Sequence, residues 1–398
     1  MALTPVSDAL ALILKDVAAL PGESVPIANA AGRVLAADLF ALRTQPPFPA
    51  SAMDGYAVRA ADTNGGQKLR VTGIVQAGQV FDGMVRQGEA VRIFTGAPVP
   101  DGADAILIQE NAQAAGDGFI TATQPVAPGK SVRRAGMDFA EGDRILERGR
   151  VLDPAALSLA AAANHAQVHV VRQPIVAILS TGDELLPPGS VTGPGQIIAS
   201  NAYAIDALAR QHGATVLALG IAPDRKDAIA AALAAASRAD ILVTLGGASV
   251  GDHDLVRGVF MEAGVALDFW KIAMRPGKPM MTGTLDGLRI LGLPGNPVSS
   301  IVCAHLFLVP LLRRLGGFPD VRQTEAAVIG ADMAENDERE DYVRAITSTE
   351  NGQMIVTPFT VQDSSMLMTL AAADALLIRP AHAPAAKAGD PCRFLRLR

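Results

Sequence analysis

At 398 residues the chain is too long for one hydrophobic core, so we expect two to four domains. Its hydrophobic content of 49% is sufficient for a large interior, which Ala, Val, Leu and Ile must fill because only 4% of the residues are aromatic. A net charge of −6 argues against general binding to nucleic acid or to an anionic membrane, since both require a basic surplus.

The cysteine content and the N-terminal sequence indicate a soluble protein of a reducing compartment. Two cysteines, Cys303 and Cys392, are too few for a disulfide framework or a metal knuckle. The first twenty residues lack a basic start and contain Asp8, Lys15 and Asp16, unlike a secretory signal. The apolar stretches near 155–163 and 228–236 are shorter than the roughly 20 residues that span a bilayer. We therefore expect a cytoplasmic protein with no membrane partner and no nucleic-acid partner.

The N-terminal third of the chain predicts an elongated domain that is interrupted by a second one. Residues 7–20 have apolar side chains at helical spacing behind a serine cap, and residues 24–39 predict a strand and then a helix through 30–37. Three prolines within 43–50 mark a hinge. Between 51 and 134 the pattern changes to short strands with glycine-rich turns, which is typical of a compact β domain.

The chain then returns to the first domain. Residues 142–170 predict a turn, a strand and an Ala-rich helix, with Asp153 as N-cap and Pro154 at the first helical position. We therefore assign 1–45 and 139–172 to a discontinuous N-terminal domain, and 46–138 to an inserted β domain.

Residues 173–319 have the alternation of a doubly wound α/β domain. Short runs rich in Val, Ile and Leu are typical of buried parallel strands, and two of the loops that follow them lead into helical spacing. Ligands of such domains bind beyond the carboxyl ends of the strands. The predicted strands end in loops that we expect to share one edge of the sheet: 180–185, 222–228, 245–255, 271–279 and 292–297.

These loops carry charges of both signs. Asp252 and Asp254 follow one strand, whereas Lys271, Arg275 and Lys278 follow another. A carboxylate at roughly 4 Å would repel a phosphate by about 4 kcal/mol at an effective dielectric near 20, unless a divalent cation bridged them. The pattern predicts an anion bound together with Mg²⁺. The alternative for any single residue is an ordinary solvated loop charge.

The last part of the chain returns to short strands. Residues 320–398 predict a small C-terminal β barrel or sandwich, and we interpret the acidic run 334–341 as a solvated hairpin loop. The predicted fold is a multidomain α/β plus β protein. A central doubly wound α/β domain at 173–319 accompanies the inserted β domain, the elongated discontinuous N-terminal domain and a C-terminal β-barrel domain at 320–398.

Six motifs follow one another along the chain: Ser51-AMDGYA, Thr95-GAPVPDGADA, Ser180-TGDEL, Gly246-GASVGDHD, Lys271-IAMRPGKP and Gly292-LPGNP. In this order they resemble the molybdopterin molybdenumtransferases, which are the bacterial MoeA proteins and the E domain of gephyrin. The resemblance covers nearly the whole chain. It implies an elongated homodimer with its active site in a cleft between subunits. It also implies an enzyme that inserts molybdate into the dithiolene of adenylylated molybdopterin, with Mg²⁺-dependent release of AMP.

The resemblance assigns catalytic-site roles to a set of acids together with one threonine and one lysine. They are Asp54, Thr95, Asp138, Glu184, Asp224, Asp254 and Lys271. Mg²⁺ would draw on Glu184, Asp252 and Asp254, and the sequence does not say which two. Structural alternatives stay open, because Asp54 could satisfy its own turn and Glu184 could cap the next helix.

A second set would hold the substrates. Glycines let the backbone approach phosphate, and prolines shape the loop. The resemblance assigns the pterin nucleotide to Gly246, Gly247, Ser249, Gly251, Pro294, Gly295, Asn296 and Pro297, and molybdate to Arg275, Lys278, Arg344 and Ser364. One of these positions, and the residue that precedes Ser364, depart from the family pattern. Arg275 is usually Lys, and Asp363 stands where Gly commonly precedes the serine, so its carboxylate must point away or pair with Arg344.

Two other functions stay open from the sequence. The α/β domain alone also resembles the molybdopterin adenylyltransferases, which consume ATP, and a gephyrin-like scaffold without catalysis is compatible with the fold. The flanking domains and the intact motifs favour the molybdenumtransferase. The expected partners are the small-molecule substrates, a second copy of the chain, a molybdopterin adenylyltransferase and proteins that mature molybdoenzymes. Molybdate and tungstate are nearly the same size, so the sequence does not separate them.

Overall fold

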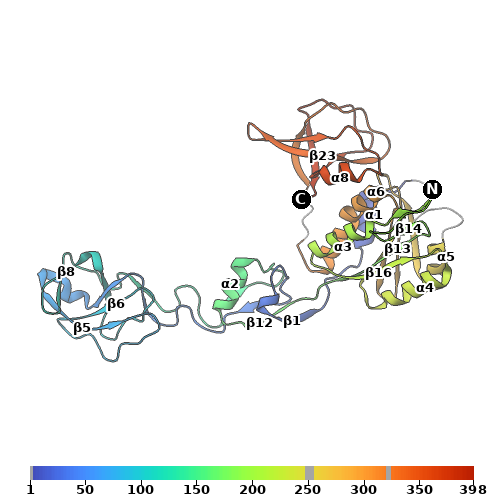
Figure 1. Ribbon diagram of the computed structural model, residues 1–398. Helices are drawn as coiled ribbons and strands as arrows, with labels where there is room; N and C mark the ends of the chain where they lie inside the picture. The colour runs from blue at the N-terminus through green and yellow to red at the C-terminus, as the bar shows by residue number, and fades with distance from the viewer. Residues whose placement is uncertain (1–2, 247–254, 320–323) are drawn as a thin grey trace. The chain divides into compact units, whose positions relative to one another are not determined.

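The structure is a computed structural model that describes residues 3–246, 255–319 and 324–398. The chain divides into two compact units, which are described one at a time. The first, which we name the α/β–barrel unit, contains Met1–Glu23, Gly32–Ala36 and Val170–Arg398. The second, which we name the N-terminal β unit, contains Ser24–Ala31 and Ala37–His169. Several elements of each unit are labelled in Figure 1.

A six-stranded sheet forms the centre of the α/β–barrel unit, in the order β16-β13-β17-β21-β20-β18. Its parallel strands are β13 (Ile175–Thr181), β16 (Thr215–Ala222), β17 (Ile241–Leu245) and β21 (Leu288–Leu293). The strands β18 (Ala266–Lys271) and β20 (Pro279–Leu285) complete the sheet in antiparallel pairings. The run before the 271–279 loop is therefore not a parallel-paired strand, contrary to the sequence prediction. Because two antiparallel steps restore direction, Lys271 still lies at the edge where the parallel strands end.

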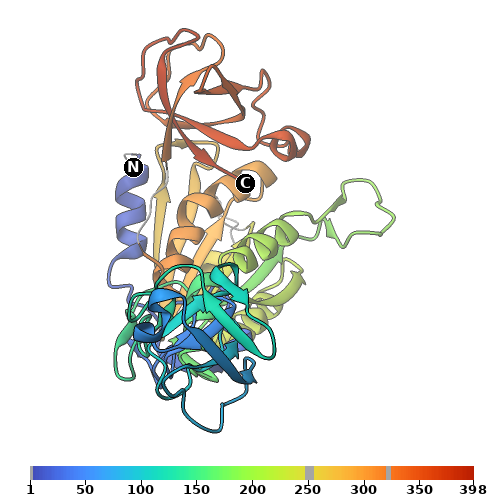
Figure 2. The same cartoon turned by 90° about the vertical axis from the view of Figure 1, so that its left-hand side faces the viewer.

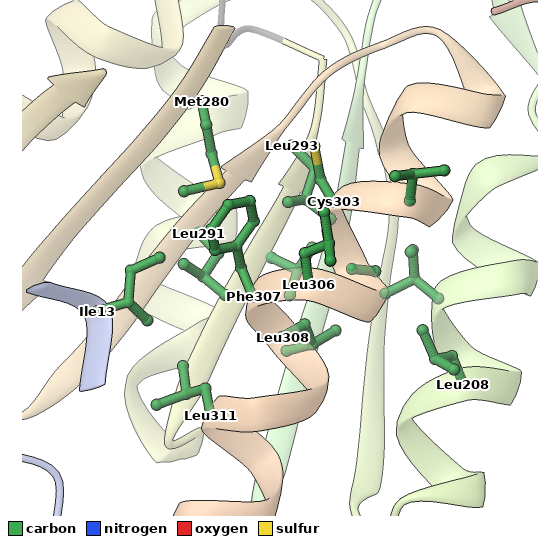
Figure 3. Close-up of a cluster of buried hydrophobic side chains, with 14 of the residues drawn as sticks. Ile13, Leu208, Met280, Leu291, Leu293, Cys303, Leu306, Phe307, Leu308 and Leu311 are labelled. Atoms are coloured by element: carbon green, nitrogen blue, oxygen red, sulfur yellow. The ribbon is translucent and has the colours of Figure 1, made fainter. Parts of the chain in front are cut away.

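Helices cover both faces of this sheet, as expected for a doubly wound domain. The helices α4 (Lys226–Ala235) and α5 (Leu255–Glu262) pack their apolar side chains on one face. The other face carries α1 (Val6–Leu14), α3 (Asn201–Gln211) and the helix 297–315. Figure 3 shows this second core, in which Phe307 and Leu311 lie close to Leu291 of β21 and Ile13 of α1. These layers fix the carboxyl ends of the strands in place.

The helix 297–315 is continuous but not regular. It consists of α6 (Pro297–Cys303), a π-helical turn (Ala304–Leu308) and α7 (Val309–Leu315). The π turn precedes Pro310, which has no N–H to donate to the preceding turn. Among the described residues, this is the one helix with the length and apolar composition of a membrane span, and 72% of its most apolar window is buried. It serves as a core helix of the α/β domain.

The C-terminal strands close into a five-stranded barrel, which settles the choice between barrel and sandwich. The closed order is β23-β24-β22-β26-β25, and β25 pairs again with β23. The strands are β22 (Thr324–Ile329), β23 (Glu340–Glu350), β24 (Gln353–Pro358), β25 (Ala375–Arg379) and β26 (Pro391–Arg396), with helix α8 (Leu367–Ala372) beside them. Phe394 and Val356 are fully buried in the barrel core. A short strand, β19 (Met274–Arg275), pairs in parallel with the start of β23.

The N-terminal β unit contains a second six-stranded sheet, in the order β7-β4-β6-β5-β9-β8. Its strands are β4 (Gly55–Val58), β5 (Lys68–Val75), β6 (Glu89–Ile93), β7 (Ala105–Ile108), β8 (Ala112–Ala114) and β9 (Phe119–Ala122). Apolar side chains fill both faces, with Ile93 in one cluster and Leu69 in the other. The predicted cap of α2 (Pro154–Ala162) is confirmed, because Asp153 accepts a 2.8 Å hydrogen bond from the Ala156 N–H.

Short elements complete the fold. Two-residue and three-residue strands pair as β2 (Leu39–Phe40) with β11 (Arg144–Leu146), β3 (Ala50–Ser51) with β10 (Val132–Arg133), and β14 (Leu185–Leu186) with β15 (Ile197–Ile198); β1 (Gly22–Pro26) pairs with β12 (Gln167–Val171). The 3₁₀ turns are Ile27–Asn29, Ala60–Gly66, Gln109–Asn111 and Ala236–Arg238. Figure 2 shows the green β14–β15 loop projecting from the α/β domain.

Two helix predictions near the N-terminus were wrong. The first helix ends at Leu14 and not at residue 20, and its N-cap is Pro5. Residues 30–37 form no helix, because Leu35 makes an antiparallel bridge to Val170 and the Val171 N–H donates to the Val34 carbonyl. Val34 and Leu35 are both buried. Tertiary pairing with a strand far along the chain therefore overrides the local helical pattern.

The glycine of the SAMDGYA motif is required by a backbone contact. A Cβ at Gly55 would lie 2.1 Å from the Leu107 carbonyl oxygen on the paired strand β7. We expect Gly55→Ala to destabilise the N-terminal β unit by about 1–3 kcal/mol or more, because the backbone must shift. Urea unfolding measures this change. Gly258→Ala is the control, since no atom lies within 4 Å of a Cβ there and the change in mid-helix should stabilise α5 by about 0.5–1 kcal/mol. Equal effects of the two variants would contradict the steric account.

Candidate active site

Three strand ends meet at the point where the strand order of the α/β sheet reverses. β16 lies on one side of β13 and β17 lies on the other, and ligands of doubly wound sheets bind at such a switch point. Gly246, directly after β17, has φ +94°, and a Cβ there would lie 3.0 Å from the Thr181 carbonyl oxygen at the end of β13. The Cα of Gly246 is also 3.9 Å from the Cβ position at Gly295. Glycine is thus needed for this close backbone approach.

The loop after β21 is fixed by side-chain amides. Asn201 at the start of α3 donates a 2.8 Å hydrogen bond to the Gly295 carbonyl oxygen. Asn296 donates a 3.1 Å hydrogen bond to the Ser364 hydroxyl, and the Val298 N–H donates to the Ser364 carbonyl oxygen at 3.2 Å. The structure therefore brings together Asn296 and Ser364, which the sequence assigned to different substrates. Asn201 was missed, because an asparagine at a helix start has no distinguishing pattern.

Pro294 and Pro297 flank this loop, as the sequence suggested. Pro294 is buried, and Pro297 occupies the first turn of α6, where its missing N–H costs nothing. Gly295 and Asn296 between them are exposed. The two prolines therefore shape a loop whose tip faces outward at the carboxyl edge.

Acidic residues lie at the ends of β13 and β16. The Asp183 carboxylate accepts a 3.0 Å hydrogen bond from the Asp224 N–H, and both side chains are exposed. Glu184 folds back over Gly182, where a Cβ would lie 2.3 Å from the Glu184 Oε2 atom. Gly182 therefore leaves the space that this carboxylate occupies. Of the predicted residues, Glu184 and Asp224 thus share the carboxyl edge with Gly246.

Part of the predicted site lies outside the described residues. This part comprises Gly247, Ser249, Gly251, Asp252 and Asp254. Two of the three predicted Mg²⁺ ligands are among them, and Glu184 is the third. Within the described ranges, no three His, Cys, Asp or Glu side chains are grouped closely enough to hold a metal ion.

Lys271 and Lys278 flank the loop between β18 and β20. Lys278 is exposed and Lys271 is half-buried, and neither ammonium group is paired with a residue that the structure describes. Between them, Gly277 has φ +116° and leaves no room for a side chain, since a Cβ would lie 2.5 Å from the Cys303 Sγ atom. Burial raises the pKa of Cys303 to about 12, so the thiol stays protonated and inert. The cysteine packs under this loop and does not take part in chemistry.

Arg344 is the largest fully buried side chain in the described structure. Its Nε atom donates to the Gln362 Oε1 atom at 3.0 Å, and its Nη1 atom donates to the Asp363 carbonyl oxygen at 2.7 Å. Gln362 in turn donates from Nε2 to the Arg344 carbonyl oxygen at 3.0 Å. Burial lowers the pKa of Arg344, and the charge of Asp363 opposes this effect. Gln362, which the sequence did not single out, therefore orients the guanidinium.

The orientation of Asp363 was open from the sequence. Its carboxylate accepts hydrogen bonds from the Ser365 N–H at 2.8 Å and from the Ser365 hydroxyl at 2.5 Å. These bonds hold the pKa of Asp363 below its usual range. The carboxylate closes a local turn with Ser365, and the hydrogen bond to Arg344 comes from the peptide oxygen instead.

Arg275 is placed differently from the other predicted oxyanion ligands. Its guanidinium is paired with Asp341 and Asp337 of the C-terminal segment. The sequence treated 334–341 as a solvated loop, because nothing in an acidic run indicates which distant cation it will meet.

In the N-terminal β unit, Asp54 and Thr95 are in direct contact. The Asp54 Oδ1 atom accepts hydrogen bonds from the Thr95 N–H and from the Thr95 hydroxyl, both at 2.8 Å. These two bonds, with the charge of Arg92, hold the pKa of Asp54 below its usual range. Asp138 is exposed in the same unit, and its carboxylate makes no hydrogen bond to any described residue. The structure therefore joins two of the three residues predicted in this unit.

Arg92 is a further residue that the sequence did not indicate. Its guanidinium lies over the rings of Tyr56 and Phe94, at 4.9 and 5.1 Å from their centroids, and donates to Gln109 Oε1 at 2.9 Å. Cation–π contacts of this kind fix the position of an arginine. In the sequence, Arg92 is a single charged residue within a predicted strand, and nothing in the pattern indicates which side chains it will contact.

Comparisons with known proteins show the family of the chain. Three family models match in succession: the MoeA N-terminal region (domain I and II) at residues 4–164, the probable molybdopterin binding domain at 177–314, and the MoeA C-terminal region (domain IV) at 326–397. Molybdopterin molybdenumtransferase 2 of Mycobacterium tuberculosis is 38% identical over 369 residues, covering 90% of each chain. The molybdopterin molybdenumtransferase of Haemophilus influenzae is 40% identical over 296 residues, or 74% of this chain and 73% of that protein.

The chain belongs to the MoeA family of molybdopterin molybdenumtransferases. The crystal structure of the MoeA protein from Pyrococcus horikosii matches over the full length of both chains, with a TM-score of 0.83 and 30% sequence identity. The predicted multidomain α/β plus β fold is thereby confirmed.

A cavity of about 860 Å³ lies elsewhere in the α/β–barrel unit of this MoeA family member. It is lined by α1, by the helix 297–315 and by barrel strands, and none of the predicted site residues contributes to it. Burial lowers the pKa of His305 in its wall to about 4, so that histidine is neutral. This cavity is therefore separate from the predicted site residues.

The contact between Asp54 and Thr95 gives a prediction on pKa. Thr95→Val removes the hydroxyl donor and keeps the N–H, so the pKa of Asp54 should rise partway toward its ordinary value. A lowered carboxyl pKa stabilises the fold above the unfolded pKa, and this contribution is lost as the pH falls through the folded pKa. The stability difference between Thr95→Val and the parent should therefore vanish in strong acid.

Titration of the Asp54 carboxyl carbon by NMR measures this shift directly. Thr123→Val is the matched control, because that hydroxyl donates to the Asn111 carbonyl oxygen and to no carboxylate. An unchanged Asp54 pKa in Thr95→Val would show that the hydroxyl bond is not formed in solution.

Proposed function

We propose that this chain inserts molybdate into the dithiolene of adenylylated molybdopterin and releases AMP, giving molybdenum cofactor. Membership of the molybdopterin molybdenumtransferase family establishes molybdenum insertion in molybdenum cofactor biosynthesis as its general activity. The observation that supports the specific reaction is the convergence of Gly246, Gly295 and Asn296 with Ser364 at the switch point of the sheet. A nucleotide pyrophosphate and an oxyanion can lie side by side there.

The backbone supplies the phosphate-binding part of the proposed site. Gly246 and Gly295 carry no side chain between the main chain and a ligand, so the backbone of these loops can approach the pyrophosphate. By resemblance, the pterin nucleotide would also contact Gly247, Ser249, Gly251, Pro294, Asn296 and Pro297. Lys271 would offset the charge that AMP takes away when the phosphoanhydride bond is cleaved.

Molybdate, a tetrahedral dianion, needs cations and hydroxyl or amide donors. Lys278 offers an ammonium group with no described partner, Arg344 offers a guanidinium oriented by Gln362, and Ser364 offers a hydroxyl held by Asn296. We assign the oxyanion to these three residues. The two dithiolene sulfurs of the substrate would bind the molybdenum, and one oxygen of molybdate would leave as water with the two thiol protons. Another water would cleave the phosphoanhydride, so the protein contributes positioning and electrostatics.

Mg²⁺ fits the donors of the carboxyl edge. Ions of this kind bind phosphates with one or two carboxylates and several waters, and Glu184 offers an exposed carboxylate at the end of β13. We propose that two of the three residues Glu184, Asp252 and Asp254 would hold Mg²⁺, which when bound would offset charge on the pyrophosphate. Asp54, Thr95, Asp138 and Asp224 would complete the polar lining.

We further propose a cytoplasmic homodimer whose cleft is shared between two subunits. The residues assigned to the site lie in both compact units, and the family resemblance implies a cleft that two copies share. The four domains would be 1–45 with 139–172, 46–138, 173–319 and 320–398. A molybdopterin adenylyltransferase would deliver the substrate, and maturation proteins of molybdoenzymes would receive the product.

Release of AMP from adenylylated molybdopterin, with molybdate and Mg²⁺ present, tests the reaction. We expect Asp54→Ala and Glu184→Ala to lower the rate by about 100-fold or more, the usual effect of removing a positioned charge from a site. Glu350→Ala, at the hairpin end of β23, is the control and should retain the parent rate. Release at the parent rate by either site variant would contradict the assignment.

Two further measurements test the choice of oxyanion and the alternative adenylyltransferase activity. Metal analysis after turnover with equal molybdate and tungstate shows which oxyanion is inserted. An adenylyltransferase would consume ATP with molybdopterin, whereas we expect no ATP-dependent adenylylation.

A further inference from the structure

Arg275 makes four hydrogen bonds, all to the segment that leads into the barrel. Its Nε atom donates to Asp341 Oδ1 at 2.8 Å, and its Nη2 atom bonds the other oxygen of the same carboxylate. Nη1 donates to Asp337 Oδ2 at 3.4 Å, and Nη2 donates to Asn336 Oδ1 at 3.2 Å. An arginine has five N–H donors, so little capacity is left for another anion.

The acceptors are themselves held in place. Asn336 donates to the carbonyl oxygens of Arg339, Arg379 and Pro380 at 2.8, 3.1 and 2.9 Å. Asp337 accepts from the Arg339 N–H at 2.9 Å and from its Nη2 atom at 2.6 Å. The barrel segment therefore presents a preformed set of acceptors.

Backbone pairing reinforces the contact. Arg275 in β19 is opposite Asp341 in β23, and the Glu340 N–H donates to the Ala273 carbonyl oxygen at 2.8 Å. The Asp341 side chain is only 13% exposed, whereas that of Arg275 is 47% exposed. A carboxylate buried to this degree is costly without its partner.

We infer that Arg275 and the segment 336–341 form a clasp that fixes the barrel against the α/β domain, and that Arg275 positions the oxyanion site without binding the oxyanion. β23 runs from this clasp to Arg344, three residues further on. The same barrel carries Ser364 to Asn296. The identity of the anion in this inference rests on the proposed function. The existence of the clasp does not depend on that function.

The shape of the side chain supports this role. The two Arg275 donors that meet Asp341, Nε and Nη2, form a planar fork, which matches a carboxylate. A lysine has a single nitrogen and cannot reproduce both this fork and the bonds to Asn336 and Asp337. Lys278, three residues further along the chain, has no partner among the described residues, and we assign molybdate binding to its ammonium group.

Two readings of Arg275 predict opposite results for molybdate binding by the purified chain. If Arg275 is a clasp, Arg275→Ala, Arg275→Lys and Asp341→Asn should each weaken molybdate binding on the order of tenfold, since the barrel residues lose their position. The double variant should be no weaker than the worse single variant. In the absence of molybdate, the affinity of each variant for adenylylated molybdopterin should stay within about twofold of that of the parent, because Gly246 and Gly295 belong to the α/β domain.

If Arg275 is instead an oxyanion ligand held back by the carboxylates, Asp341→Asn should tighten molybdate binding and Arg275→Lys should nearly preserve it. Glu338→Gln is the matched control, because it removes an equal charge from an exposed side chain of the same segment without touching Arg275. If Asp341→Asn bound molybdate more tightly than Glu338→Gln does, the clasp proposal would be wrong.

Thermal unfolding gives a readout that does not depend on the reaction. Each single variant should lower Tm by about 2–4 °C, and the double variant should lower it by no more than the larger single effect. Additive losses would overturn the clasp. Failure of the parent chain to bind molybdate would contradict the proposed function. In that case the comparison of Tm between the single and double variants would still test whether the clasp exists.

Discussion

The close approach of backbone segments at the switch point of the α/β sheet is the constraint on which the site depends. Gly246 lies so near Thr181 and Gly295 that a side chain at 246 would collide with the end of β13. Three loops with different sequences can therefore present main-chain groups to one ligand. Buried helices on both faces hold the strands that carry these loops. Packing far from these loops thus fixes their positions.

The charged side chains around this point form an acidic group and a basic group. Exposed carboxylates at the ends of β13 and β16 stand near the backbone cradle, and cations stand by the barrel. The barrel enters the site through Ser364, which bonds Asn296, and through Arg344, whose direction Gln362 sets. An oxyanion and a phosphate can be bound by separate donors in this arrangement. Arg275, although cationic, balances the buried Asp341 instead.

Periodicity and turn residues predicted much of the fold. Apolar runs followed by glycine loops identified the α/β domain and the shared carboxyl edge, and Asp153 with Pro154 identified the start of α2. Predictions failed where a distant strand decided the outcome. Residues 30–37 look helical, but Leu35 pairs with Val170, and the 266–271 strand is antiparallel because β20 returns beside it. Contacts such as Arg275 with Asp341 join two segments that each look like solvated loops, so sequence alone could not pair them. The roles of Asn201, Arg92 and Gln362 depend on the same kind of contact.

A crystal structure with molybdate bound, recorded with anomalous scattering at the molybdenum edge, tests the central claim most directly. The account predicts one strong molybdenum peak in contact with Arg344, Ser364 and Lys278, beside the loop that carries Asn296. A molybdenum peak bound by Arg275 with the Asp341 contact broken, or one remote from the carboxyl edge, would contradict it.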